Sequence, residues 1–252
     1  MDGQLKDKVI VVTGGAMGIG FALSKGCAEQ GATVIMGDIN KEKLDLAVKS
    51  LQAQGLSCEG IYLDVSKEEM INTAIDGIVK KYGHLDGLIN NAGIASKVKF
   101  LDSTVADLDK VININIRSIY LCCRAAAKYM AAQKSGSIVN IASVAARNGG
   151  GLMGTSLYAA SKGAVISFTK GIARELAPYN VHVNAIAPGS IDTPMTTVGR
   201  DPAEYAATIK KMPLGRRGKP EEIVGPAILL LSQAGSFMVG TTLDVNGGIY
   251  MY

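Results

Sequence analysis

The sequence is poor in the residues that build metal centres and disulfide frameworks. Its 252 residues include two histidines, four cysteines and no tryptophan. The cysteines show neither a CxxC pair nor a Cys/His spacing suited to zinc; they are Cys27, Cys58, Cys122 and Cys123. We therefore expect free, mostly buried thiols in a reducing compartment and no bound metal.

Long apolar runs and blocks of like charge are also missing. No apolar stretch reaches the roughly 18 residues of a membrane-spanning helix, and the polar first eight residues predict no signal peptide. The net charge is only +4, without a run of five or more Lys and Arg. This argues against nucleic acid and membrane surfaces as partners. The sequence predicts a soluble, cytoplasmic protein.

Short β-branched runs alternate with helical patterns along the whole chain. Strands are expected at 9–13, 33–37, 61–63, 87–89, 137–142, 181–186 and 242–245, and helices at 19–30, 41–54, 67–81, 105–131, 157–176 and 220–231. The segment 190–219, with three prolines, is expected to be irregular. This alternation predicts one α/β domain over residues 1–252. Its fold is a doubly wound, Rossmann-like three-layer sandwich with a seven-stranded parallel sheet.

A glycine-rich segment follows the first expected strand and opens a helix. Gly14, Gly18 and Gly20 stand in a GxxxGxG spacing, which lets a backbone approach phosphates at a helix N-terminus. Asp38 ends the second strand 18 residues later, where a carboxylate would accept both ribose hydroxyls of NAD and repel the 2′-phosphate of NADP. The alternatives are a packing turn for the glycines and a helix N-cap for Asp38.

Tyr158 and Lys162 lie four residues apart in a helical pattern and hence on one helix face. A lysine beside a tyrosine favours the phenolate, which is a general base for an alcohol proton. Lowering the pKa of a phenol from ~10 to ~7 needs on the order of 4 kcal/mol. One lysine seldom supplies that, so a second positive charge is required. The alternative is a solvated pair on an amphipathic helix.

Taken in order, the motifs resemble the short-chain dehydrogenase/reductase family, in its single-domain branch. They are the TGxxxGxG run Thr13–Gly20, Asp64-Val65, Asn90–Gly93, Asn115, Ser143, Tyr158-x-x-x-Lys162, Pro188-Gly189 and Val245–Gly248. The resemblance implies a catalytic set of Asn115, Ser143, Tyr158 and Lys162. Tyr158 would be the acid/base, and Lys162 with the cationic nicotinamide would lower the tyrosine pKa. Ser143 would anchor the substrate oxygen, and Asn115 would hold a relay water.

The resemblance also implies a set of cofactor contacts. These are Gly14, Met17, Gly18, Ile19, Gly20, Asp38, Ile39, Asp64, Val65, Asn91, Ala92, Gly93, Tyr158, Lys162, Pro188, Gly189, Ile191 and Thr193, with Ile186 beside the nicotinamide. Each single residue has a structural alternative, such as a strand-end cap for Ser143 or a buried backbone-bonded amide for Asn115.

The substrate side is less constrained by sequence. Expected pocket residues are Ser143, Ala145, Asn148, Met153, Tyr158 and Met195, with Arg147 and Arg200 flanking them. The loop 148–154 lengthens the usual Ser–Tyr gap of the family, and Tyr179 and Asn180 stand where acyl-carrier-protein reductases often have an arginine. We expect a substrate lid around 190–211. The apolar C-terminal tail is expected between subunits, and the resemblance implies a homotetramer.

The sequence therefore predicts an NAD-dependent oxidoreductase that interconverts a secondary alcohol and a ketone. One alternative is an NADP-dependent 3-oxoacyl thioester reductase, which the stretch Pro213–Arg216 resembles. A second is a non-catalytic NAD-sensing protein on the same fold.

Overall fold

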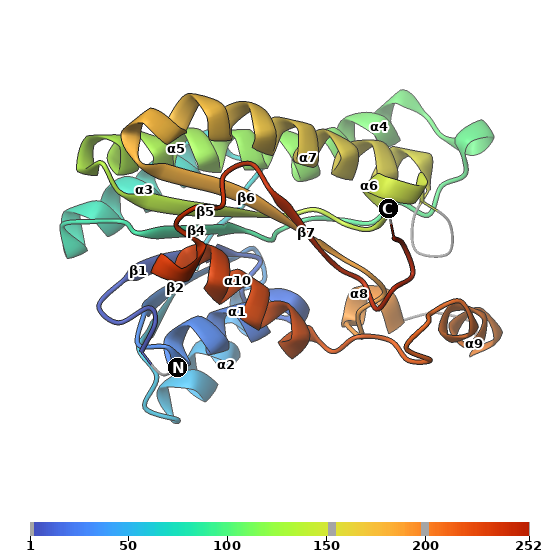
Figure 1. Ribbon diagram of the computed structural model, residues 1–252, viewed down its shortest axis with the longest axis horizontal. Helices are drawn as coiled ribbons and strands as arrows, with labels where there is room; N and C mark the ends of the chain where they lie inside the picture. The colour runs from blue at the N-terminus through green and yellow to red at the C-terminus, as the bar shows by residue number, and fades with distance from the viewer. Residues whose placement is uncertain (1–2, 151–154, 198–201, 252) are drawn as a thin grey trace.

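The computed structural model describes residues 3–150, 155–197 and 202–251, and its strands form one parallel sheet (Figure 1). The strand order is β3-β2-β1-β4-β5-β6-β7. The strands are β1 (Val9–Thr13), β2 (Thr33–Asp38), β3 (Cys58–Tyr62), β4 (Gly87–Asn90), β5 (Gly136–Ile141), β6 (Val181–Pro188) and β7 (Thr242–Val245). The predicted fold class is confirmed.

Helices cover both faces of this sheet. One layer contains α3, α5 and α7, and the opposite layer contains α1, α2 and α10 (Figure 1). The helices are α1 (Gly18–Glu29), α2 (Lys41–Gln52), α3 (Glu68–Tyr82), α4 (Val105–Ile112), α5 (Ser118–Gln133), α6 (Ala145–Asn148), α7 (Ser156–Leu176), α8 (Pro194–Thr197), α9 (Pro202–Lys210) and α10 (Val224–Leu231). Within the described residues, no helix has both the length and the apolar character needed to cross a bilayer.

The β-branched first strand contributes side chains to the hydrophobic cores on both faces of the sheet. Val9 and Val11 belong to the core beneath α3, α5 and α7, whereas Ile10 and Val12 belong to the core on the opposite face. Successive side chains of a strand point to opposite faces, so an unbroken apolar run fits a strand covered on both sides. Full burial of each such side chain stabilises the fold by about 1.5–3 kcal/mol.

All four cysteines are free and buried, as expected from their spacing. Burial raises the pKa of the Cys27 thiol to about 12. It also raises the pKa of Cys122 to about 12. These thiols therefore behave as small apolar side chains.

The order of strands reverses around β1, which pairs with β2 on one side and with β4 on the other. The helices that follow β1 and β4 consequently lie on opposite faces, and a crevice opens at the carboxyl ends of these strands. Helices α6 and α8 lie at the same end of the sheet (Figure 1). This end holds most of the side chains that the sequence singles out.

Three sequence expectations need correction. The third strand runs over Cys58–Tyr62 rather than 61–63; its alternating burial on a sheet edge leaves a weak apolar signal. The helix expected over 105–131 is interrupted by a π-helical turn, Asn113–Arg117. The segment 190–219, expected to be irregular, contains α8 and α9.

Candidate active site

The glycine-rich turn after β1 depends on glycine at specific positions. Gly14 and Gly18 have φ angles of 63° and 54°, a region that favours glycine. A β-carbon on Gly20 would lie only 1.9 Å from the carbonyl oxygen of Gly14. Gly20 therefore lets α1 start against the turn and does not itself line the cleft.

Asp38 ties the end of β2 to this turn. One carboxylate oxygen accepts a hydrogen bond from the Ala16 amide at 3.1 Å, and the other accepts one from the Asn40 amide at 2.9 Å. The alternative of a helix N-cap is wrong, because the Asn40 side chain caps α2 through the Lys43 amide. Asp38 is buried and borders the cleft together with Ile39.

A cleft of about 460 Å³ runs along the carboxyl ends of β1, β2 and β4. Twelve of the expected cofactor contacts line it: Gly14, Met17, Gly18, Ile19, Asp38, Ile39, Asp64, Val65, Asn91, Ala92, Gly93 and Thr193. Leu63, Ile94, Lys110, Ile114 and Pro194 also line it and were missed from the sequence. Lys110 and Ile114 come from the α4–π segment, and only the tertiary fold brings that segment to the cleft.

A smaller cavity of about 100 Å³ continues from this cleft toward β5 and β6. The two share Ile19, Asn91, Gly93, Thr193 and Met195 as lining residues. The smaller cavity brings together Ser143, Tyr158 and Lys162 with Pro188, Gly189 and Ile191. Ile186, expected beside the nicotinamide, is instead buried in the core on the α1 side.

Lys162 is held by the sheet. Its Nζ donates a hydrogen bond of 2.8 Å to the carbonyl oxygen of Ile141 and lies 5.9 Å from the centroid of the Tyr158 ring. Burial lowers the pKa of this lysine to about 8. Both residues face the same small cavity, and the alternative of a solvated pair is wrong for Lys162, which is fully buried.

The expected lowering of the Tyr158 pKa does not occur in the protein alone. Burial of the phenol raises its pKa, and a hydrogen bond from the Ser143 hydroxyl lowers it by less. The reason is that desolvation disfavours the phenolate more than one neutral donor stabilises it. Ser143 also accepts a hydrogen bond of 3.1 Å from the Ala145 amide, so it caps the turn after β5 as well.

Asn115 lies on the π-helical turn and clamps the loop after β4. Its Oδ1 accepts from the Ile94 amide at 2.9 Å, and its Nδ2 donates to the Ile94 carbonyl at 2.9 Å and to Ser161 Oγ at 3.0 Å. Ser161 in turn donates to the Tyr158 carbonyl at 2.7 Å. The alternative of a buried, backbone-bonded amide is therefore what the structure contains. This clamp joins the cleft wall to the helix that carries Tyr158.

The expected substrate-pocket residues are only partly brought together. Ser143, Tyr158 and Met195 line the small cavity, whereas Ala145 is buried outside it. Asn148 is exposed and accepts a hydrogen bond from the Gly150 amide. Arg147 pairs with Asp244 of β7 instead of facing the pocket. Met153 and Arg200 lie outside the described residues.

The donor set and shape of the cleft fit a dinucleotide. Gly14 and Gly18 hold the left-handed backbone of the turn that leads into α1, the buried Asp38 carboxylate borders the cleft, and Tyr158 and Lys162 face the small cavity beyond it. A glycine-rich βαβ unit with a Ser, Tyr and Lys set beyond it defines a class of nicotinamide-dependent oxidoreductases.

The chain belongs to the short-chain dehydrogenase/reductase family. Residues 14–250 match a family model described as enoyl-(acyl carrier protein) reductase. The chain is 40% identical to the 3-oxoacyl-[acyl-carrier-protein] reductase FabG of Thermotoga maritima, covering 98% of this chain and 99% of the relative. It is 39% identical to the cyclopentanol dehydrogenase of a Comamonas species, covering 98% of each.

A solved structure of a 3-oxoacyl-[acyl-carrier protein] reductase with bound NAD, from Brucella melitensis, superposes with a TM-score of 0.92. That protein is 34% identical, and the superposition covers 100% of this chain and 94% of the other. The resemblance read from the motifs is thereby confirmed, and the protein is an oxidoreductase of this family.

Proposed function

We propose that this protein interconverts a secondary alcohol and a ketone with NAD as cofactor and Tyr158 as the general acid/base. The observation that carries the proposal is the continuity of two cavities. The dinucleotide-shaped cleft opens into the small cavity that Ser143, Tyr158 and Lys162 share. A substrate oxygen in that small cavity meets a phenol and a hydroxyl at once.

Each polar group has a distinct task in this proposal. Oxidation of the alcohol releases a proton, which the Tyr158 oxygen accepts, and reduction of the ketone returns it. The Ser143 hydroxyl, already hydrogen-bonded to the phenol, donates to the substrate oxygen and stabilises the charge that develops there. The bound nicotinamide supplies or accepts the hydride.

Lys162 stabilises the phenolate by its charge. Its pKa of about 8 leaves the ammonium mostly protonated at pH 7, so a positive charge stands beside the phenol. In the proposed complex the ammonium donates to the nicotinamide ribose. Asn115 supports a relay water near Lys162 and, through Ile94, keeps Gly93 at the cofactor.

Asp38 is the proposed reason for NAD rather than NADP. Its buried carboxylate stands at the adenine-ribose end, where it accepts ribose hydroxyls and repels a 2′-phosphate. The Asp38→Asn variant keeps an oxygen that accepts from Ala16 while removing the charge. We expect the NADH-over-NADPH ratio of kcat/KM to fall at least about tenfold, by roughly 1.4 kcal/mol or more. A wild-type preference for NADPH would overturn the cofactor assignment.

The reaction itself is tested with a panel of secondary alcohols, polyols and hydroxy acids, by following NADH formation. Activity should appear with wild type and fall by about 10²–10⁴-fold in Tyr158→Phe. Tyr129→Phe serves as the control, because Tyr129 bonds Asp76 on the surface, far along α5. If Tyr158→Phe oxidised every accepted alcohol at the wild-type rate, a non-catalytic NAD-sensing role would replace this proposal.

A 3-oxoacyl thioester reductase is the second candidate. The identity of 40% to a FabG protein favours it, as does the Pro213–Arg216 stretch. The similar identity to cyclopentanol dehydrogenase favours a small free alcohol equally well. Reduction of acetoacetyl thioesters by NADPH at a rate far above any alcohol oxidation with NAD would establish this candidate.

We also propose a cytoplasmic homotetramer with the C-terminal tail between subunits. Val239 and Met251, in the C-terminal part of the chain, are apolar side chains exposed in the monomer, and contact with another subunit would bury them. Light scattering that gave the mass of one chain at micromolar concentration would exclude this assembly.

A further inference from the structure

Arg217 is a buried cation that no step of the proposed reaction uses. Its side chain is only 2% exposed, and it lies between α9 and the 3₁₀ turn Pro220–Ile223. Burial of a guanidinium is costly unless charged and polar partners surround it. The partners of Arg217 therefore indicate what its burial is for.

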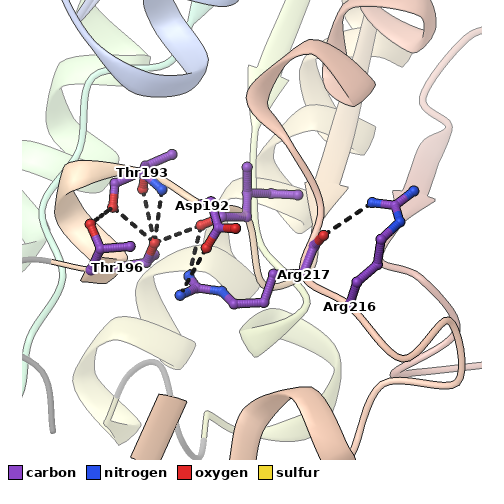
Figure 2. A network of polar contacts seen from close by, with 7 residues as sticks. Asp192, Thr193, Thr196, Arg216 and Arg217 are labelled. Carbon is purple, nitrogen blue, oxygen red and sulfur yellow. Dashed lines mark hydrogen bonds and ion pairs between the residues drawn. The ribbon is translucent and has the colours of Figure 1, made fainter. Parts of the chain in front are cut away.

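Two of its partners belong to the segment Ser190–Thr197, which borders both cavities. Arg217 Nη2 donates to the Ile191 carbonyl at 2.8 Å, and Nη1 lies 3.1 Å from Asp192 Oδ1. Figure 2 shows the Arg217 side chain reaching toward Asp192, whereas the neighbouring Arg216 guanidinium lies on the other side and donates to the Arg217 carbonyl at 3.0 Å. A planar guanidinium presents several donors in a fixed fork, so it fixes both partners at once.

The Ile191 carbonyl joins this arginine to the cofactor wall. It also accepts a hydrogen bond of 2.6 Å from Thr196 Oγ1, which in turn accepts from the Thr193 amide at 3.0 Å (Figure 2). Thr193 lines the dinucleotide cleft and the small cavity. Three hydrogen bonds thus connect the charge of Arg217 to the amide of a cleft residue.

The backbone brings the two segments together at the same place. Ile191 and Gly218 form an isolated parallel bridge, in which the Asp192 amide donates to the Gly218 carbonyl at 2.8 Å. The Gly218 amide donates to the Ser190 carbonyl at 2.9 Å. A β-carbon on Gly218 would lie 2.5 Å from the end of the Ile191 side chain, so a larger residue there would displace that side chain.

We infer that Arg217 is a positioning residue that pre-forms the cofactor wall at Ile191–Met195, and with it the nicotinamide end of the cleft. The inference rests on the proposed function for the identity of the ligand. Asp38 and Asp64, which we place at the adenine end, lie at the end of β2 and just after β3, and their side-chain hydrogen bonds go to Ala16, Asn40 and Ser66. Loss of the arginine should therefore weaken contacts to the nicotinamide half of the cofactor and spare the adenine half.

The first test needs no cofactor. Hydrogen exchange is followed by mass spectrometry in wild type, Arg217→Met, Arg217→Lys, Asp192→Asn and the control Arg216→Met. Arg216 is the adjacent control, because its guanidinium pairs with Glu222 on the surface and contacts Arg217 only at the main-chain carbonyl, at 3.0 Å, and not at the guanidinium under test. Exchange in a peptide covering 190–197 should be at least about tenfold faster in Arg217→Met and unchanged in Arg216→Met.

The second test compares two ligands. Binding of NADH should weaken about tenfold in Arg217→Met, equivalent to about 1.4 kcal/mol, whereas binding of ADP, which fills only the adenine half, should stay unchanged. Arg217→Lys should recover part of the loss, because an ammonium reaches one partner but not both. Asp192→Asn should give a smaller loss in the same direction. A general loss of structure would weaken both ligands and speed exchange in core peptides.

The outcomes separate this inference from the proposed function. Wild type that failed to bind NADH would refute the proposed function and leave the exchange experiment to decide the role of Arg217. The inference would be overturned if Arg217→Met showed the same exchange rate in the 190–197 peptide and the same NADH affinity as wild type. If Arg217→Met fails to fold, the other two variants decide. The inference would be overturned if Asp192→Asn and Arg217→Lys both showed the exchange rate and the NADH affinity of wild type.

Discussion

Lys162 Nζ donates a hydrogen bond of 2.8 Å to the carbonyl oxygen of Ile141, the last residue of β5. The sheet thus fixes the ammonium at the edge of the small cavity, independently of the tyrosine one helical turn earlier. The lysine is poised at a strand end, so its position does not depend on the ionisation of the phenol.

Replacement of this lysine should separate activity from stability. We expect Lys162→Met to lose about 10²–10⁴-fold in kcat for alcohol oxidation, because the phenolate loses its nearest cation. The same variant should unfold at an equal or higher urea concentration, since a buried charge becomes an apolar side chain. Lys170→Met, on an exposed position of α7, should change neither quantity. Equal activity of Lys162→Met and wild type would contradict the role assigned to Lys162.

The pH dependence of stability should carry the signature of Lys162. Its pKa is about 8 in the folded protein and 10.5 in the reference state. Between these values the unfolded chain binds the extra proton, so this group makes the free energy of unfolding rise with pH. The rise should be on the order of 2–3 kcal/mol from pH 8 to pH 10. Below pH 8 both states are protonated and the slope vanishes.

Other groups titrate in this window, so the measurement is a difference. The raised pKa values of Cys27 and Cys122 act with the opposite sign above pH 9, because unfolded thiols ionise first. Urea unfolding is therefore measured for wild type and Lys162→Met at several pH values. The contributions of the cysteines cancel in the difference between the two free energies of unfolding. The stability advantage of Lys162→Met should shrink from pH 8 to pH 10, and a constant difference would refute the assignment.

Removal of the hydrogen bonds by which Asn115 clamps the loop at Ile94 should lower the stability of the protein substantially. Asn115→Ala leaves the Ile94 amide and carbonyl without their buried partner, and we expect a loss of about 3 kcal/mol in the free energy of unfolding. Ser161→Ala removes one member of the network and should cost about 1 kcal/mol. Asn113→Ala, on the same turn but partly exposed, should stay within about 0.5 kcal/mol of wild type. Equal losses in Asn113→Ala and Asn115→Ala would argue against the clamp.

Two glycine-to-alanine changes should have opposite effects. Gly20→Ala places a methyl group 1.9 Å from the Gly14 carbonyl, so the turn must move. We expect a loss of about 1–3 kcal/mol in stability and no measurable NADH binding by fluorescence titration. Gly77→Ala, in the middle of α3 with open space around it, should gain about 0.5–1 kcal/mol. Retained NADH affinity in Gly20→Ala would show that the turn tolerates a side chain.

The sequence predicts the buried strands well because their signal is local. Val9–Thr13 is a β-branched run buried at every position, and Val181–Pro188 is buried at every position except His182, so little tertiary information is needed to recognise them. The edge strand Cys58–Tyr62 has one buried residue, Cys58, followed by partly buried and exposed positions, so its apolar signal is weak and its predicted boundaries are shifted. Helices α8 and α9 carry no strong apolar period, and α8 is held by the Thr196 and Thr197 hydroxyls, which donate to the carbonyls of Ile191 and Thr193.

For the candidate site too, some features can be predicted from the local sequence and others depend on the tertiary fold. The spacing of Tyr158 and Lys162 predicts a shared helix face, but the solvent exclusion that moves both pKa values depends on the surrounding fold. Lys110 reaches the cleft only because the helix after the β4 loop folds back over it. Arg217 stands in a charged stretch that is typical of a surface, and its burial and its contacts with Ile191 and Asp192 become visible only in the fold.

The hydrogen bond from the Ala16 amide to Asp38 constrains how this enzyme can change its cofactor. The carboxylate that we propose to bind the ribose of NAD also anchors the glycine turn, so in this proposal one side chain serves cofactor selectivity and loop geometry together. An exchange for alanine or arginine would release the turn while it altered the charge. A change toward NADP should therefore keep a short hydrogen-bond acceptor at position 38. The cation that binds the 2′-phosphate would be introduced at another position, such as that of Ile39.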